Sequence, residues 1–280
     1  MRGMGFNMLT EETKKKVQEL QQLEQMYVLY SQMTKMPFVT CDPESFNDQV
    51  WVFTDKDKVQ EYAKKYTEQK YLLMAAEIKK PQMLGFFIGM FAIGVNSVML
   101  IDAEGEMELE LTDIVRQPDY SKIPEEKRPL MNPQLQLSGI YYMQEMRRPL
   151  KKEERTANIQ EMEEEMAANT VKSRYLLALD MGDVPEGGEV KKENLKVPYI
   201  KDNNGNIFLP IFTDPLELQK FARGKKLRSL IVPFTELEKY QIKDAQGFAI
   251  NPFGFNLILM NEQIPALKKR FHVGDEEKQQ

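Results

Sequence analysis

The 280-residue chain has little of the side-chain chemistry that many enzymes use, since it contains one cysteine and one histidine. The single cysteine, Cys41, can form no disulfide within the chain and no cysteine-based zinc site. The single histidine, His272, stands beside a charged tail, which indicates a surface residue rather than the base of a catalytic triad. We therefore expect a protein that is not an enzyme, with no catalytic residues, no metal and no cofactor.

Phosphate-binding and calcium-binding loops are missing as well. Neither GxxxxGK[ST] nor GxGxxG occurs, and KDNNGN lacks the acidic twelfth position of an EF-hand loop, where Thr213 stands. The net charge of −5, from 38 basic and 43 acidic residues, argues against nucleic acid as the main partner. The first residues form no signal-peptide or myristoylation pattern, so we expect a cytoplasmic protein.

An internal repeat organises what is present. VWVFTDKDKVQEYAKK, residues 50–65, aligns with LPIFTDPLELQKFARG, residues 209–224, and each copy contains Phe-Thr-Asp. The match extends upstream to MPFVT against VPYIK, and downstream to Phe91-Ala92-Ile93 against Phe248-Ala249-Ile250. Repeats of this kind indicate copies of one structural unit. We predict a first module from residue 1 to 148, with an insertion after residue 101, and a second from 149 to 280.

The local patterns predict an α+β fold in which each module is a mixed or mainly antiparallel sheet packed on helices. Residues 197–212 form a predicted hairpin, because Asn204-Gly205 supplies turn conformations with positive φ. Asp214 is a predicted helix cap, with Pro215 at the first helical position and Glu217 completing a capping box. In the insertion, VMLIDAEGEMELEL is a second predicted hairpin with its turn at Glu104-Gly105.

Two pairs of carboxylates stand where helices are expected to begin. Asp55 with Asp57, and Asp214 with Glu217, follow the two Phe-Thr motifs. Negative side chains stabilise helix N-termini. We therefore interpret both pairs as helix-capping groups rather than as metal ligands or acid–base catalysts.

The uncharged stretch from Met83 to Ile101 has the length of a short membrane span, about 28 Å as one helix. Its repeat counterpart contains ELEKYQIKDAQGFAI, which a bilayer does not accept as a span. We predict instead a helix from Pro81 to about Met90 and a strand from Val98 to Ile101. This helix is apolar on all sides, so we expect the insertion or the second module to cover it. If it were exposed, it would be a candidate partner surface.

The second copy resembles the amino-terminal domain of the SseB family, the "enhanced serine sensitivity" proteins of bacteria. The residues that carry the resemblance are Phe212, Thr213, Val232, Pro233, Asn251 and Pro252. The first copy departs from this pattern, with Trp51-Val52, Ala75-Ala76 and Gly94-Val95 at the corresponding places. The resemblance implies a bacterial protein and supplies no established catalytic residues.

These observations favour a non-catalytic cytosolic interaction or regulatory protein with an unidentified protein partner. The alternatives are an enzyme or small-molecule-binding protein with a site between the modules, and a membrane-associated protein that uses Met83 to Ile101. The aromatic residues near the Asn-Pro turn and on the apolar helix are the candidate partner surface: Asn251, Pro252, Phe253, Phe255, Phe86 and Phe87.

Overall fold

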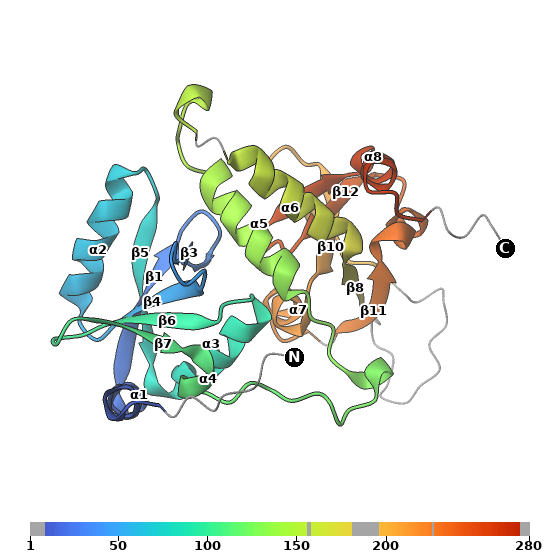
Figure 1. Ribbon diagram of the computed structural model, residues 1–280. Helices are drawn as coiled ribbons and strands as arrows, with labels where there is room; N and C mark the ends of the chain where they lie inside the picture. Colours follow the sequence, from blue (N-terminus) through green and yellow to red (C-terminus); the bar gives the residue numbers. More distant parts are fainter. Residues whose placement is uncertain (1–8, 156–157, 181–195, 226, 275–280) are drawn as a thin grey trace.

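The computed structural model describes residues 9–155, 158–180, 196–225 and 227–274, and it contains two β-sheets surrounded by helices (Figure 1). Within these residues, one sheet has seven strands and the other has six. Each sheet combines antiparallel pairs with a parallel pair. The prediction of an α+β fold with two sheet–helix modules is confirmed.

The first module contains the elements α1 (Glu11–Gln22), β1 (Gln25–Ser31), β2 (Met36–Pro37), β3 (Val39–Cys41), β4 (Asp48–Phe53), α2 (Lys56–Glu68), β5 (Leu73–Lys79), α3 (Lys80–Ala92), β6 (Ser97–Ile101), β7 (Glu106–Glu110) and α4 (Leu111–Ile114). The connection to the second module contains η1 (Glu125–Lys127), α5 (Pro133–Met146) and η2 (Lys152–Glu154). The second module contains α6 (Ile159–Lys172), β8 (Arg174–Asp180), β9 (Ile200–Lys201), β10 (Ile207–Phe212), α7 (Pro215–Ala222), β11 (Leu227–Pro233), η4 (Phe234–Tyr240), β12 (Ala245–Ile250), β13 (Leu257–Met260) and α8 (Gln263–Arg270).

The two sheets have the same strand order and the same strand directions. In the first, β5 pairs with β1, and the order continues through β4, β6 and β7. In the second, β11 pairs with β8, and the order continues through β10, β12 and β13. The pairs β4–β6 and β10–β12 are parallel, and the other pairs along these paths are antiparallel. The modules thus share one topology, while their origin by duplication and the boundary at residue 148 stay predictions.

One step of the sequence alignment is wrong. Phe91 and Ala92 lie at the end of helix α3, whereas Phe248-Ala249-Ile250 lie in strand β12. The strand that occupies the place of β12 in the first sheet is β6, because it pairs in parallel with β4 as β12 pairs with β10. A short apolar run has no periodicity that separates a buried helix end from a buried strand.

The predicted hairpins at residues 98–111 and 197–212 are both confirmed. In the first, β6 pairs with β7, and the Asp102 N–H donates to the Gly105 carbonyl at 3.0 Å. This hairpin occupies the place of β12 and β13, so it belongs to the strand set that the two sheets share. In the second, β9 pairs with β10, and Gly205 has a φ of 84° at the turn.

The repeated Phe-Thr-Asp motif has the same local role in both modules. Phe53 and Phe212 end the central strands β4 and β10 with side chains that are fully buried. The next aspartates, Asp55 and Asp214, are the N-caps of α2 and α7. The Asp55 side chain accepts from one backbone N–H group, and the Asp214 side chain accepts from two. An apolar strand end followed by a capping carboxylate is a local signal, which is why the sequence reveals it.

The uncharged stretch divides as predicted, into helix α3 and strand β6. Gly94 ends the helical segment with a φ of 87°, and a Cβ there would lie 2.9 Å from the Pro133 carbonyl oxygen. The helix has 13 residues, a length of about 20 Å. Across the part of the chain that the structure describes, no helix has both the length and the apolar character of a membrane span.

Helix α5 lies between the two sheets beside α6 and contacts both modules (Figure 1). The Gln144 amide exchanges hydrogen bonds with the backbone of Val39 in the first module, at 3.1 and 2.9 Å. On the other side, Gly139 lies against the ring of Phe255 in the second module. The Arg147 guanidinium donates to the carbonyls of Met33 and Asn256, at 2.7 Å each. Because one hydrophobic cluster also contains residues of both sheets, the modules share a core.

Candidate binding site between the modules

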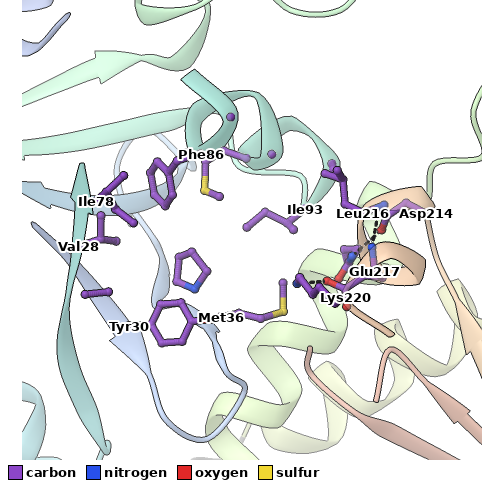
Figure 2. A pocket seen from close by; sticks show the side chains of 17 residues that line it. Val28, Tyr30, Met36, Ile78, Phe86, Ile93, Asp214, Leu216, Glu217 and Lys220 are labelled. Carbon is purple, nitrogen blue, oxygen red and sulfur yellow. Dashed lines mark hydrogen bonds and ion pairs between the residues drawn. The ribbon is translucent and has the colours of Figure 1, made fainter. Parts of the chain in front are cut away.

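A hollow of about 240 Å³ lies where the first sheet, helix α3 and helix α7 of the second module meet (Figure 2). We call it the inter-module hollow. On β1, Tyr27 and Leu29 point to the side of the sheet covered by α2, whereas Val28 points to the side of α3 and into the hollow. The apolar lining from the first module includes Val28, Tyr30, Met36, Ala76, Ile78 and Phe86.

Two glycines of α3 keep the hollow open. Gly85 and Gly89 are one turn apart, both line the hollow, and a Cβ at either position would meet no atom within 4 Å. A glycine in a helix interior costs about 1 kcal/mol relative to alanine. A glycine inside a helix is usually required because another part of the chain packs closely against it, but neither of these glycines has such a neighbour. The space beside both glycines is instead part of the hollow.

The polar wall comes from α7 and α5. Asp214, Glu217 and Lys220 follow one another at intervals of three residues, so they lie on one face of α7. Asp214 is saturated with hydrogen bonds. Its Oδ1 accepts from the N–H groups of Leu216 and Glu217, at 2.9 and 3.1 Å. Its Oδ2 accepts from Thr213 Oγ1 at 2.7 Å and from Gln136 Nε2 at 2.8 Å.

Glu217 is a buried carboxyl with one free oxygen. Its Oε1 pairs with Lys220 Nζ at 2.5 Å, while Oε2 has no hydrogen-bond partner, and only 2% of the residue is exposed. Burial raises the pKa of this carboxyl, although Lys220 acts in the opposite direction. The capping-box prediction is wrong, because Glu217 contacts Lys220 rather than the Asp214 N–H. Gln136, 1% exposed, likewise leaves its Oε1 without a partner.

Asn251 positions the start of α7 from the neighbouring parallel strand. Its Oδ1 accepts from the Thr213 N–H at 3.0 Å, and its Nδ2 donates to Thr213 Oγ1 at 2.8 Å. The residue is fully buried and has a φ of 48°. Thr213 in turn donates to Asp214, so this network links the end of β12 to the polar wall of the hollow.

Three residues of the predicted partner surface are buried, and the prediction is wrong for them. Asn251 bonds to Thr213, Phe255 packs against Gly139 of α5, and Phe87 belongs to the core, so none of the three can contact a partner in this fold. Phe86 is partly exposed and lines the hollow, while Pro252 and Phe253 are partly exposed at the Asn-Pro turn. Their role in partner binding stays a prediction.

The cover over helix α3 is incomplete. Phe87 and Met90 are buried, and α5 packs against the helix, but Leu84 is 61% exposed. Leu216 of α7, which lines the hollow, is 43% exposed. Apolar side chains are therefore accessible on both modules.

Other residues considered in the sequence lie away from the hollow. Cys41 is exposed, and His272 is also exposed near the carboxyl end of the described chain. The pKa of the Cys41 thiol is raised, chiefly because the thiol is partly shielded from water and also because the negative charges of Asp48 and Asp42 are nearby. Among the described residues, no three histidine, cysteine, aspartate or glutamate side chains gather as a group that could hold a metal.

Sequence reasoning missed Gln136 and Lys220, and it interpreted Glu217 as a capping group. The three-residue spacing of Asp214, Glu217 and Lys220 was a signal for one helix face. No pattern in the neighbouring sequence indicates that this helix face lies beside Gln136 or beside the glycines of α3.

The described residues define a two-module α+β protein with a partly polar hollow at the junction. Residues 152–266 match the family described as "SseB protein N-terminal domain". The predicted resemblance to the SseB N-terminal domain is therefore confirmed for residues 152–266.

Two solved structures align with most of the chain. "Tic22 from Plasmodium falciparum" is 12% identical, covers 92% of this chain and 98% of that chain, and has a TM-score of 0.21. "Anabaena Tic22 (protein transport)" is 9% identical, covers 94% and 98%, and has a TM-score of 0.20. TM-scores this low support no statement about fold or function. No curated protein matches the chain.

We expect Glu217→Gln to stabilise the protein at pH 7 by about 1 kcal/mol, because it removes a buried charge and leaves the half-exposed Lys220 solvated. A raised pKa means that the folded state holds the proton more tightly than the unfolded state. The free-energy cost of the ionised carboxyl in the folded state therefore grows as the pH rises above 4.5, the ordinary pKa of a glutamate. Urea denaturation at pH 7 and pH 4 should show the advantage of glutamine shrinking at the lower pH. A glutamine variant that is less stable at pH 7 would contradict this assignment.

Proposed function

We propose that the protein is a non-catalytic interaction or regulatory protein of the bacterial cytoplasm, and that the inter-module hollow is its binding site. One observation carries the proposal: apolar side chains of the first module and polar side chains of the second line a single open hollow. A concave, mostly apolar site with a few polar groups is the usual form of a binding site.

The size of the hollow suits a small apolar group. Its volume of about 240 Å³ exceeds the ~150 Å³ of an apolar protein cavity that takes up benzene. An apolar group that leaves water here gains about 25 cal/mol per Å² of buried surface. Because both modules line the hollow, an occupant would also favour their packed arrangement, which is a simple basis for regulation.

The proposal is tested by a substitution that fills the hollow, followed by a comparison of the molecules that the protein still binds. Gly89→Leu places a side chain in the open space, whereas Gln60→Leu adds the same side chain on an exposed face of α2 and is the matched control. The proteins and small molecules that copurify with each variant are compared by mass spectrometry. We expect at least one bound species to be lost with Gly89→Leu and retained with Gln60→Leu. Identical profiles for the two variants would contradict the proposal.

Catalysis in the same hollow is a second candidate, which the raised pKa of Glu217 beside Lys220 favours. Carboxyls of this kind serve as general acids in enzymes. Under the non-catalytic proposal, a compound that binds in the hollow should be recovered unchanged after long incubation. Conversion that depends on Glu217 would instead favour an enzyme.

A further inference from the structure

We propose that the protein forms a homodimer in which two copies of strand β11 (Leu227–Pro233) pair edge to edge and antiparallel, with Leu230 on the two-fold axis. The second sheets of the two copies then join into one continuous sheet. The inference goes beyond the proposed function and concerns a different surface, since β11 contributes no residue to the lining of the inter-module hollow.

Strand β11 is an edge of the second sheet. It pairs with β8 on one side, and among the described residues no strand pairs with its other side. Its residues 228–231 are all exposed, with Leu230 at 38% and Ile231 at 43%. Successive residues of a strand point to opposite faces, so apolar side chains are accessible on both faces of this edge. Such an edge is a pairing site for another strand.

The other long edge strands carry charges where β11 has none. Strand β7 contains Glu106, Glu108 and Glu110. Strand β5 holds the place of β11 in the first sheet. Its Glu77 lies opposite the third residue of β1, as Ile231 of β11 lies opposite the third residue of β8. Charged residues on an edge strand oppose pairing with another chain. The centre of β11, Ser229-Leu230-Ile231, lacks this protection.

The direction of the backbone groups in β11 follows from its pairing with β8. In an antiparallel pair, residues that bond to the neighbouring strand alternate with residues whose N–H and C=O groups point away from it. The Phe234 N–H donates to the Ser173 carbonyl at 3.1 Å, so the even-numbered residues of β11 are those that bond toward β8. Ser229 and Ile231 therefore direct their backbone groups to the open edge.

These outward groups match a second copy of the same strand. In an antiparallel register centred on Leu230, Ser229 of one copy lies opposite Ile231 of the other, and each such pair exchanges two N–H···O=C hydrogen bonds. Both outward donors and both outward acceptors of each copy are then satisfied. The strand ends offer no further free donor, because the Leu227 N–H donates within the chain and Pro233 has no N–H.

The charges that flank β11 also favour a second copy. Arg223 and Lys225 precede the strand, and Glu236 follows it in η4. In an antiparallel pair, the residues before one strand lie beside those after its partner, so opposite charges approach each other at both ends of the interface. Glu236 pairs with Lys239 in its own chain, yet 36% of its side chain is exposed and accessible to a second cation.

A disulfide between copies tests the register. Leu230 lies opposite the same residue of the second copy as a non-hydrogen-bonded pair, with Cα atoms about 4.5 Å apart, a separation that a disulfide spans. We expect Leu230→Cys, in a Cys41→Ser chain that removes the exposed native thiol, to give a covalent dimer with oxidised glutathione. The control is Ser229→Cys in the same chain, whose two copies lie about 8 Å apart, too far for a disulfide. Equal cross-linking of the two variants, or none, would overturn the inference.

Sedimentation velocity on the full chain, from about 0.1 to 500 μM, measures the dimer itself. An interface made by one strand pair is small, so we expect a dissociation constant of about 1–100 μM. Ser229→Pro removes an outward N–H that the monomer does not use, and Leu230→Lys places two like charges opposite each other. We expect each substitution to weaken association by about tenfold or more.

The matched control is Ala75→Pro in β5. Ala75 lies opposite the fifth residue of β1, as Ser229 lies opposite the fifth residue of β8, so the substitution makes the same change on the other module's edge. We expect this variant to dimerise like the unmodified chain, and circular dichroism confirms that each variant is folded. A chain that stays monomeric at about 500 μM, including one whose β11 binds only another protein, would overturn the inference. None of these substitutions alters a residue of the hollow, so the proposed function would stand.

Discussion

Replacing Asn251 by alanine is expected to lower the free energy of unfolding by about 2–4 kcal/mol. The substitution removes both side-chain hydrogen bonds to Thr213 and leaves the buried Thr213 N–H without an acceptor. An orphaned buried donor costs about 1–3 kcal/mol. Alanine at a φ of 48° adds about 1 kcal/mol of backbone strain. Urea denaturation followed by circular dichroism measures the change.

A glycine at the same position separates the two contributions. Asn251→Gly also loses the side-chain bonds but relieves the left-handed backbone, so it should be less destabilising than alanine by about 1 kcal/mol. Because Thr213 also bonds to Asp214, both variants should disturb the start of α7 and weaken binding in the inter-module hollow. An alanine variant with unchanged stability would show that the network does not support this part of the fold.

Gly247→Ala is expected to destabilise the protein by about 3 kcal/mol or more. A Cβ at residue 247 would lie 2.1 Å from the Leu259 carbonyl oxygen and 2.9 Å from the Met260 Cα. Both are backbone atoms of β13, so neither can move aside without disturbing the pairing of Gly247 with Met260. Overpacking against atoms that cannot relax belongs to the most damaging class of substitution.

The matched control is the same substitution at Gly89. The Cβ there meets open space in a helix, so Gly89→Ala should stabilise the protein by about 0.5–1 kcal/mol. Thermal melting of the two variants should therefore give shifts of opposite sign. Shifts of the same sign would mean that helix propensity and steric fit do not dominate at these positions.

Local chemistry made much of the fold predictable. Asp214 caps a helix because its side chain reaches N–H groups two and three residues away, and that reach depends on a few adjacent residues. The turn at Gly205 follows from its own backbone freedom. The failed step at Phe91 involved a short apolar run, where neighbouring residues do not decide between helix and strand.

The candidate site could not be predicted from such local patterns. Gly89, Gln136 and Glu217 are separated by 47 and 81 positions and lie on three helices, α3, α5 and α7. Their approach depends on how α5 packs between the modules. The same packing buries Phe255 against Gly139, so this residue of the candidate partner surface belongs to the core.

The amino-acid sequence by itself determined the α+β class, the repeated Phe-Thr-Asp strand ends, the hairpins and the division of the uncharged stretch into a helix and a strand. Each of these depends on hydrogen bonds or burial between residues close in the chain. Only the tertiary structure decided the equivalence of β6 with β12, the burial of Asn251 and the existence of the inter-module hollow. Those features arise from contacts between distant segments, whose free energies depend on a packing geometry that no local pattern contains.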